Sequence, residues 1–324
     1  AARCGARVML TDEQSRFGGS LLDERTEVAG DSGVRWVDSS IEELTRCEEV
    51  TLLPRTTVFG QYDHNVFGAV ERVNDHVAEP PPHQPRQRLW HIIARQVVLA
   101  SGALERGLHF TDNDRPGVML AGAVRAYVNR YAVVPGRSAV VFVNNDSGVR
   151  TAMDLASVGV KVKALVDVRS TVGTVTHRQL ESIGAEVLEN SVVTRVHGRT
   201  QVHGVVVRPR SGGRARRFDC DLLCLSGGSD PRIHLTSHTG VRPVFSSATD
   251  CFVAGDVGDT MQVVGAASGR FDLAEAIRSG HEGGTQAVLR CGLSVTCSCE
   301  PAALECAESS SPAAVLWRVH EASK

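Results

Sequence analysis

This chain of 324 residues has few aromatic residues, a small net charge and no long apolar run. Aromatics make up 5% and the formal net charge is −2 at pH 7. A nucleic-acid groove or a polyanionic tail needs a strong excess of one charge, so the composition speaks against both. No apolar stretch approaches the roughly 18 residues of a membrane span, and the first residues do not have the pattern of a signal peptide. We therefore expect a protein without nucleic-acid or membrane partners.

Paired cysteines are also missing, although the chain has nine cysteines. Redox sites of the disulfide-reductase type use a C-x-x-C pair, and none is present, so a self-sufficient disulfide reductase is disfavoured. Cys291, Cys297, Cys299 and Cys306 could bind a metal or an iron–sulfur cluster, but their spacing favours unpaired thiols, and no metal site is predicted. Reduced thiols are typical of an intracellular setting, and we expect a cytoplasmic protein.

Short apolar runs that end in small residues occur three times. Val97 to Ala100 is followed by Ser101-Gly102, the segment from Asp221 to Gly228 repeats the pattern, and Cys251 to Asp256 ends in Gly-Asp. Continuous apolar runs are typical of strands buried on both faces of a parallel sheet. Small residues at their carboxyl ends let backbone approach a ligand, so the pattern predicts an α/β, two-lobed dinucleotide-binding fold.

The first lobe is expected to begin inside a βα unit. Arg7 to Thr11 reads as a strand, and Asp12 follows it where an acid accepts hydrogen bonds from the adenosine ribose. Gly18-Gly19 then provides a turn without β-carbons. The first strand and its glycine-rich phosphate loop are not found before Ala1, which predicts a unit truncated at its amino end. The alternative is an ordinary surface strand that ends in Asp.

The second lobe is expected to carry a degenerate phosphate loop. Ala139 to Asn144 begins a βαβ unit, but the loop from Asn144 to Gly148 holds one glycine instead of the usual three. The side chains of Asn144 and Asp146 would crowd and repel a diphosphate at the helix amino terminus. The sequence therefore predicts a weakened or lost nucleotide site in this lobe.

Two further predictions concern local structure. Ser40 and Glu43 have the spacing of a capping box, which predicts a helix beginning at Ser40. The segments from Val50 to Gly60, Val66 to Val73 and Arg88 to Arg95 alternate with a period of two, which predicts an antiparallel meander.

Several longer motifs resemble one known family. They are TTVFGQYDH from Thr56, LASGA from Leu99, NDRPGVML from Asn113 and VNND from Val143. They are similar to the alpha subunit of heterotetrameric sarcosine oxidase, and the resemblance runs to about Gly292. Relatives with the same plan include alpha subunits of opine, proline and other amino-acid dehydrogenases and of hydrogen cyanide synthase. The fold that this resemblance implies is like that of the pyridine nucleotide-disulfide oxidoreductases.

The resemblance also implies cofactors and partners. It implies NAD in the first lobe, or FAD as in the dehydrogenase relatives. FAD and FMN are expected on a flavin-bearing beta subunit or shared with it, and smaller subunits complete the hetero-oligomer. Oxidation of the N-methyl amine uses those flavins, and oxygen accepts the electrons to give hydrogen peroxide. The implied cofactor-binding residues of this chain are Asp12, Glu13, Gln14, Arg16, Gly18, Gly19, Thr57, Val58, Ala100, Ser101, Gly102, Gly255 and Asp256.

Within this set Asp12 is the ribose acid, Thr57 and Val58 lie by the adenine, and Asp256 is the terminal acid. Asp256 would meet the sugar or ribityl hydroxyls of the cofactor; the alternative is an Asp that only caps the next helix. No catalytic residue is predicted in this chain.

The predicted domain plan is discontinuous. Residues 1–134 and 229–292 form the first lobe, residues 135–228 form the second, inserted lobe, and residues 293–324 form an irregular tail that leads to a missing aminomethyltransferase-like domain. The predicted function is that of a dinucleotide-binding oxidoreductase subunit that is not active alone. The alternatives are the alpha subunit of an FAD-dependent amino-acid or opine dehydrogenase, and a non-catalytic scaffold.

Overall fold

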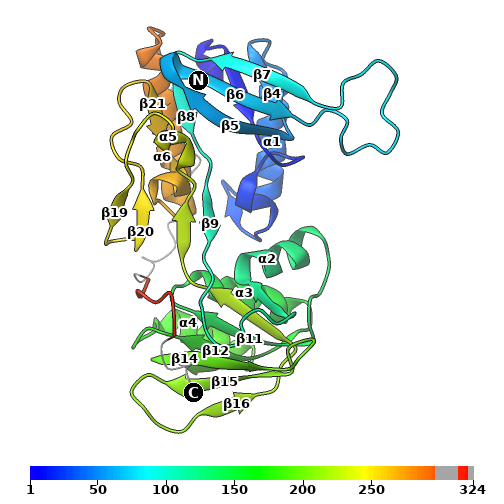
Figure 1. Ribbon diagram of the computed structural model, residues 1–324, viewed down its shortest axis with the longest axis vertical. Coiled ribbons are helices and arrows are strands. Elements are labelled where there is room, and N and C mark those ends of the chain that lie inside the picture. The colour runs from blue at the N-terminus through cyan, green and yellow to red at the C-terminus, as the bar shows by residue number, and fades with distance from the viewer. Residues whose placement is uncertain (296–312, 320–324) are drawn as a thin grey trace.

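The residues that the structure describes form two lobes. The computed structural model describes residues 1–295 and 313–319, and Figure 1 shows the lobes one above the other. The chain passes between them twice, in β9 (Ala103–Glu105) and β18 (Ser229–Pro231), and these two strands pair with each other in antiparallel fashion. The lower lobe is therefore inserted into the upper one. The upper lobe corresponds to the predicted first lobe and the lower lobe to the predicted second lobe, so the predicted two-lobed α/β arrangement is confirmed.

A five-stranded parallel sheet is the centre of the lower lobe. Its order is β10-β17-β11-β12-β13. The strands are β10 (Val118–Leu120), β17 (Leu222–Ser226), β11 (Ser138–Val143), β12 (Lys161–Asp167) and β13 (Glu186–Leu188). The helices are α2 (Ala121–Arg125), which continues as a π-helical turn over Ala126–Arg130, α3 (Ser147–Ser157) and α4 (Thr174–Ser182). Helices α3 and α4 connect successive parallel strands, as the predicted βαβ unit requires.

Strand β11 shows why its apolar run is continuous. Val141 and Val143 pack toward the helices α2, α3 and α4, whereas Val140 and Phe142 pack toward the opposite face. Because side chains alternate along a strand, a strand covered on both faces must be apolar at every position. All five residues from Ala139 to Val143 are fully buried.

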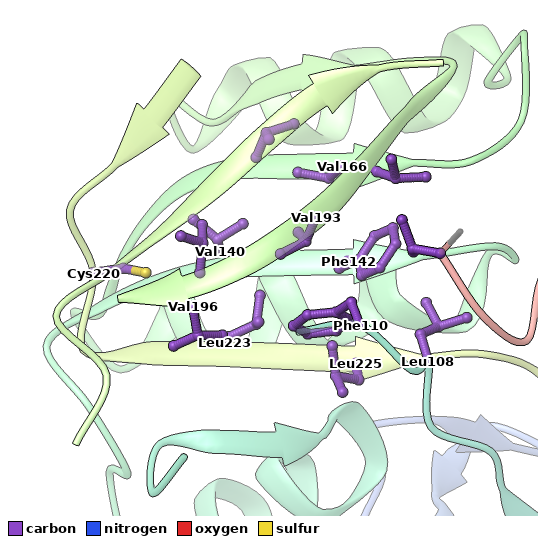
Figure 2. Packing of buried hydrophobic residues seen from close by; sticks show 14 of the residues in the cluster. Leu108, Phe110, Val140, Phe142, Val166, Val193, Val196, Cys220, Leu223 and Leu225 are labelled. Carbon is purple, nitrogen blue, oxygen red and sulfur yellow. The ribbon is translucent and has the colours of Figure 1, made fainter. Parts of the chain in front are cut away.

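The opposite face is covered by a three-stranded antiparallel sheet. It consists of β14 (Ser191–His197), β15 (Gly204–Pro209) and β16 (Arg216–Phe218). Figure 2 shows Val193 and Val196 of β14 facing Phe142 and Leu223 across the layer. The lower lobe thus has three layers, with the parallel sheet in the middle.

The lower lobe begins earlier in the chain than the sequence predicts. Strand β10 pairs with β17, and Val124 of α2 lies in the helix-side core of the lower lobe. Residues 118–134 were expected in the first lobe, whereas the structure places β10 and α2 with the second. A strand of three residues has too few positions to show a period in the sequence.

The upper lobe is built from smaller sheets. Two parallel pairs, β1–β4 and β8–β21, are accompanied by the β5-β6-β7 meander and by the hairpins β2–β3 and β19–β20. The strands are β1 (Val8–Thr11), β2 (Glu27–Val28), β3 (Asp31–Ser32), β4 (Val50–Leu53), β5 (Thr56–Tyr62), β6 (Val66–Glu71), β7 (Arg88–Ile93), β8 (Val97–Leu99), β19 (Val244–Ser246), β20 (Cys251–Val253) and β21 (Met261–Val263). The helices are α1 (Gly33–Thr45), α5 (His234–Ser237) and α6 (Leu273–Arg290), with short 3-10 turns at Ala2–Cys4, Gly19–Leu22, Asp63–Asn65 and Gly265–Ser268.

One local prediction was wrong, and the predicted meander was correct except for its first residues. Helix α1 begins after Ser32, whose hydroxyl accepts a hydrogen bond from the Arg35 N–H, while the Ser40 hydroxyl donates to the Trp36 carbonyl inside the helix. The run from Val50 to Gly60 is two strands, because Arg55 takes a left-handed conformation with φ of 54°. Strand β4 then pairs with β1, and only β5 joins the meander.

None of the helices in residues 1–295 or 313–319 is long and apolar enough to cross a membrane.

The layered core leads to a first test. Phe142→Ala should lower the free energy of unfolding by about 3–5 kcal/mol, since it removes a fully buried ring. That ring packs edge-to-face on Phe110 with centroids 5.9 Å apart. Chemical denaturation measures the loss. Phe245→Ala is the matched control, because Phe245 makes a similar ring pair with Phe252 but is 47% exposed. Equal losses in the two variants would contradict the three-layer packing.

Candidate functional site

The loop after β1 contains the first predicted cofactor residues. Asp12 extends the β1–β4 pairing through a hydrogen bond from its N–H to the Leu53 carbonyl. Its carboxylate accepts a hydrogen bond from the Gln14 N–H at 2.8 Å. An acid therefore stands at the carboxyl end of a parallel strand, which is where the predicted ribose contact requires it.

Arg232 brings this loop to the turn after β8. Its guanidinium binds the Glu13 carboxylate at 2.7 Å. Its main chain donates to the Gly102 carbonyl at 2.9 Å and accepts a hydrogen bond from the Ser101 hydroxyl at 2.6 Å. Two predicted segments that lie far apart in the sequence, Asp12–Gln14 and Ala100–Gly102, thus contact one residue that directly follows β18.

A second arginine reaches the same loop from the lower lobe. Arg130, at the end of the π-helical turn, donates to the Gln14 side-chain oxygen at 2.8 Å. Burial raises the pKa of the Asp12 carboxyl, against the hydrogen bond from Gln14, while Arg130 and Arg232 favour the charged form. A half-buried carboxylate with nearby guanidinium groups is a suitable acceptor for sugar hydroxyls.

The glycine pair has two different roles. Both residues have positive φ, 134° at Gly18 and 54° at Gly19. A β-carbon at Gly18 would lie within about 3.0 Å of the Leu22 and Val37 side chains, so Gly18 is needed for packing. A β-carbon at Gly19 would meet nothing within 4 Å, so Gly19 leaves room for an approaching group. Arg16 pairs with both carboxylate oxygens of Asp38 on α1, at 2.6 and 2.8 Å.

The remaining predicted residues lie on other strand ends. In β5, Thr57 is exposed while Val58 packs on the cluster around Leu99. Gly102 has φ of 74° and open space where a β-carbon would be. A β-carbon at Gly255 would lie 2.5 Å from the Arg242 carbonyl, and the exposed Asp256 accepts a hydrogen bond from the Gly258 N–H in its own turn.

Arg130 and Arg232 were missed in the sequence. Neither lies in a motif, and both contact the Asp12 loop from segments that the fold brings there. The only local signal at Arg232 is its position just after a buried strand end and Gly228. Arg130 lies at the end of a helix, where nothing distinguishes it from a solvated arginine.

The loop from Asn144 to Gly148 in the lower lobe is hydrogen-bonded to other parts of the same chain. Asn145 accepts a hydrogen bond from the Ser147 N–H at 2.8 Å and donates to the Ser226 carbonyl at 3.1 Å. The Asn144 side chain donates to the Gly227 carbonyl at 3.2 Å and to the Ala314 carbonyl at 2.8 Å. Polar groups that would face a diphosphate at the start of α3 are therefore already paired within the chain.

An internal ion cluster adjoins this loop. Arg169 lies 2.6 Å from an Asp146 oxygen and 2.8 Å from an Asp167 oxygen, and Asp167 is fully buried at the end of β12. Burial alone would lower the pKa of Arg169, but its bonds to the two carboxylates raise it, so the guanidinium stays charged. The chain's own carboxylates thus neutralise the Arg169 cation beside the loop that precedes α3.

Glu105 lies where β9 enters the lower lobe. Its carboxylate accepts a hydrogen bond from the Gly122 N–H at 2.6 Å, at the beginning of α2. Burial raises the pKa of this carboxyl, against the hydrogen bonds from Gly122 and Ser226. The burial of Glu105 at the lobe junction therefore opposes its charge.

Other sites receive no support. In the described residues no group of three or more His, Cys, Asp or Glu side chains could hold a metal ion. Cys291 is a free, half-buried thiol at the end of α6, and Cys297, Cys299 and Cys306 lie outside the described residues. A cavity of about 280 Å³ lies between the first turn, α1 and α6, and none of the predicted cofactor residues lines it.

The comparisons with known proteins decide the relationship. Sarcosine oxidase subunit alpha of Rhizobium meliloti (strain 1021) is 42% identical over 323 residues, 98% of this chain and 32% of that protein. The subunit from Corynebacterium sp. (strain P-1) is 40% identical over 302 residues, 90% of this chain and 31% of that protein. This chain is a relative of the sarcosine oxidase alpha subunits. It spans about a third of the length of these curated relatives. No protein-family model matches it.

Solved structures confirm the fold of this sarcosine oxidase alpha-subunit relative. Thioredoxin reductase of Lactococcus lactis has a TM-score of 0.66 at 16% identity, covering 90% of this chain and 92% of that one. L-proline dehydrogenase from P. horikoshii has a TM-score of 0.61 at 19% identity, covering 90% of this chain and 54% of that one. The predicted two-lobed fold, like that of the pyridine nucleotide-disulfide oxidoreductases, is therefore correct.

Glu105 provides a test of the lobe junction. Its pKa is raised in the folded state, so stability is lost as pH rises from the unfolded value toward the folded one. Glu105→Gln removes this charge, and we expect the variant to gain stability relative to the parent protein above about pH 4.3, the unfolded value. Denaturation midpoints between pH 4 and 8 measure the effect.

Asp221→Asn is the opposite control. Burial alone would raise the pKa of Asp221, but hydrogen bonds from the Ser138 and Arg137 N–H groups lower it. The parent protein should therefore lose stability relative to this variant only as pH falls below about 3.9. A Glu105→Gln difference that does not change with pH would show that the carboxyl is well solvated.

Proposed function

We propose that this chain is the dinucleotide-binding part of the alpha subunit of a multi-subunit flavin amine oxidase. The observation that carries the proposal is the contact of Arg232 with both the Asp12 loop and the turn after β8. These are strand ends at which α/β folds bind dinucleotides, and they converge in the upper lobe. The similarity to sarcosine oxidase alpha subunits supports the same reading.

The residues at this place fit one end of a dinucleotide. The Asp12 carboxylate would accept hydrogen bonds from ribose hydroxyls, and Gly19 and Gly102 leave space for a close approach of the ligand to the backbone. We propose NAD as this cofactor, with FAD as the alternative. A bound NAD would supply a nicotinamide ring that carries hydride, and a bound FAD a ring that carries two electrons.

The lower lobe is proposed to hold no dinucleotide. Its loop has Asn144, Asn145 and Asp146 where a phosphate loop has glycines, and Asp146 is paired with Arg169. A diphosphate bound here would displace those hydrogen bonds and lie close to the Asp146 carboxylate. Two like charges that lie next to each other oppose binding by several kcal/mol.

The reaction of the whole protein is proposed from its relatives. Sarcosine, oxygen and water would give glycine, hydrogen peroxide and formaldehyde. Where tetrahydrofolate accepts the carbon, it would take the place of water and methylene-tetrahydrofolate would replace formaldehyde. The chemistry would take place on FAD and FMN held by, or shared with, a flavin-bearing beta subunit, with smaller subunits completing the complex. This chain would position the assembly and bind the dinucleotide, in the cytoplasm.

Two alternatives remain in view. The similarity in fold to L-proline dehydrogenase from P. horikoshii favours an alpha subunit of an FAD-dependent amino-acid or opine dehydrogenase. The hydrogen-bonded loop of the lower lobe favours a scaffold role, but for that lobe alone. An activity assay of the complete complex with sarcosine, proline and an opine as substrates distinguishes the proposed amine oxidase from the dehydrogenase alternative.

Asp12 is the residue that tests the cofactor site. In the full-length protein, Asp12→Ala should weaken dinucleotide binding by about 1–3 kcal/mol, because an ionised acceptor for the ribose hydroxyls is lost. Titration calorimetry with NAD and, separately, with FAD measures the change. Asp146→Ala in the lower lobe is the control and should leave the affinity nearly unchanged. The reverse ranking would place the cofactor in the lower lobe.

The subunit role has its own test. The full-length alpha subunit expressed alone should release no sarcosine-dependent hydrogen peroxide, since the flavins are proposed on the partner. Co-expression with the beta subunit should restore peroxide release. A coupled peroxidase assay follows both preparations. Steady peroxide release from the isolated alpha subunit would show that the active site lies within it.

A further inference from the structure

Residues 313–319, called the strap below, lie against the lower lobe near the carboxyl ends of its parallel strands (Figure 1, red). The Ala314 N–H donates to the Asn144 carbonyl at 2.9 Å, and the Asn144 side chain donates back to the Ala314 carbonyl at 2.8 Å. The His109 N–H donates to the Trp317 carbonyl at 2.9 Å, and the Val319 N–H donates to the His109 carbonyl at 2.9 Å. These four hydrogen bonds attach the strap to two segments of the lower lobe.

Apolar packing adds to this attachment. Val319 is 4% exposed and belongs to the core cluster that also contains Leu108 and Phe110. Ala314 and Leu316 pack against the same cluster. The strap is therefore part of the lower lobe's core. Burial of its apolar surface stabilises this attachment by about 25 cal/mol for each Å² removed from water.

The side chain of Trp317 links the strap to the upper lobe. Its indole N–H donates to the Asp250 carboxylate at 3.1 Å, and Asp250 directly precedes β20. The Arg106 guanidinium lies over the Trp317 ring, 5.0 Å from its centroid. One side chain thus contacts the upper lobe and the crossing between the lobes at once.

Arg106 lies within that crossing. Its N–H donates to the Gly228 carbonyl and its carbonyl accepts from the Gly227 N–H, both at 2.8 Å. Its guanidinium binds the Asp230 carboxylate at 3.0 Å and the Asp250 carbonyl at 3.1 Å. Any rotation of the lobes about β9 and β18 must therefore move Arg106 relative to Trp317 and Asp250.

A second set of contacts joins the lobes beside α2. Glu24 of the upper lobe pairs with Arg125 at 3.5 Å and with Arg150 at 3.0 Å, and Asp23 lies 3.6 Å from Arg130. In Figure 1 α2 lies to the right of β9, whereas the strap lies to its left. The crossing is thus held on both sides.

We propose that the strap locks the two lobes at a fixed angle, so that they move as one body. The strap ties the lower lobe's core, through Trp317, to Asp250 of the upper lobe and to Arg106 of the crossing.

Hydrogen exchange and a distance between the lobes test this in the full-length protein. Trp317→Ala removes the link to the upper lobe, and Ala314→Pro removes the N–H that bonds to Asn144. Both should raise amide exchange at His109, Arg106 and Gly227 at least about tenfold, which corresponds to about 1.4 kcal/mol of lost protection. Val315→Ser is the matched control, because Val315 is in the same segment but 70% exposed.

The distance is measured between spin labels at Ile93 in the upper lobe and Val175 in the lower lobe. Orthogonally reactive residues carry the labels, because the chain has nine cysteines. The distribution should be narrow in the parent protein and in Val315→Ser, and broad in Trp317→Ala. Trp317→Phe keeps a ring over Arg106 and loses the N–H donor, so its distribution should have an intermediate width.

Two results would overturn the proposal. One is a broad distribution in the parent protein itself. The other is equal exchange and equal width in Trp317→Ala, Ala314→Pro and Val315→Ser. Because Trp317→Phe and Ala314→Pro leave most of the packing in place, they decide the question even if Trp317→Ala unfolds.

Discussion

The antiparallel pairing of β9 with β18 is the constraint on which the rest of the structure depends. The chain enters and leaves the lower lobe through these two strands, so everything near the junction takes its position from them. Arg232 follows β18 directly and reaches Glu13 at 2.7 Å, while Glu105 ends β9 and receives the Gly122 N–H at 2.6 Å. The same pair of strands therefore positions both the proposed cofactor-binding residues and the beginning of α2.

The two lobes treat their strand ends in opposite ways. In the upper lobe, Gly19 and Gly102 leave open space beside a half-buried acid. In the lower lobe, Asn144 and Asp146 fill the equivalent place, and their partners Ala314 and Arg169 come from elsewhere in the chain. A buried ion pair gains little net stability over apolar packing, but it is costly to break once formed. These pairings support our proposal that the lower lobe holds no dinucleotide, although it has the fold in which α/β proteins usually bind one.

Sequence patterns predicted many of the strands and the position of the Asp12 loop. Where the predictions failed, the structure depends on contacts between segments that are far apart in the sequence. The parallel strands were predictable because burial on both faces demands continuous apolar runs, as in β11. The position of Asp12 at the end of β1 was predictable because an acid directly after a strand is a local signal, and its contact with a ribose stays a prediction. The helix start at Ser40 was wrong because the S-x-x-E pattern also occurs inside helices, and the apolar positions Trp36 and Val37 already belong to α1. Arg130 and Arg232 could not be found, since only the folded chain brings them to the Asp12 loop.

The inserted arrangement also has an evolutionary consequence. Because Glu105 and Ser229 are paired neighbours in β9 and β18, the lower lobe begins and ends at one point of the upper lobe. A domain whose two ends lie together can be inserted, exchanged or removed as a unit without stretching its host. The covalent connection therefore lets the lower lobe change, and even lose a ligand, without stretching the upper lobe, as long as the contacts of Trp317 with Asp250 and of Glu24 with Arg150 are kept.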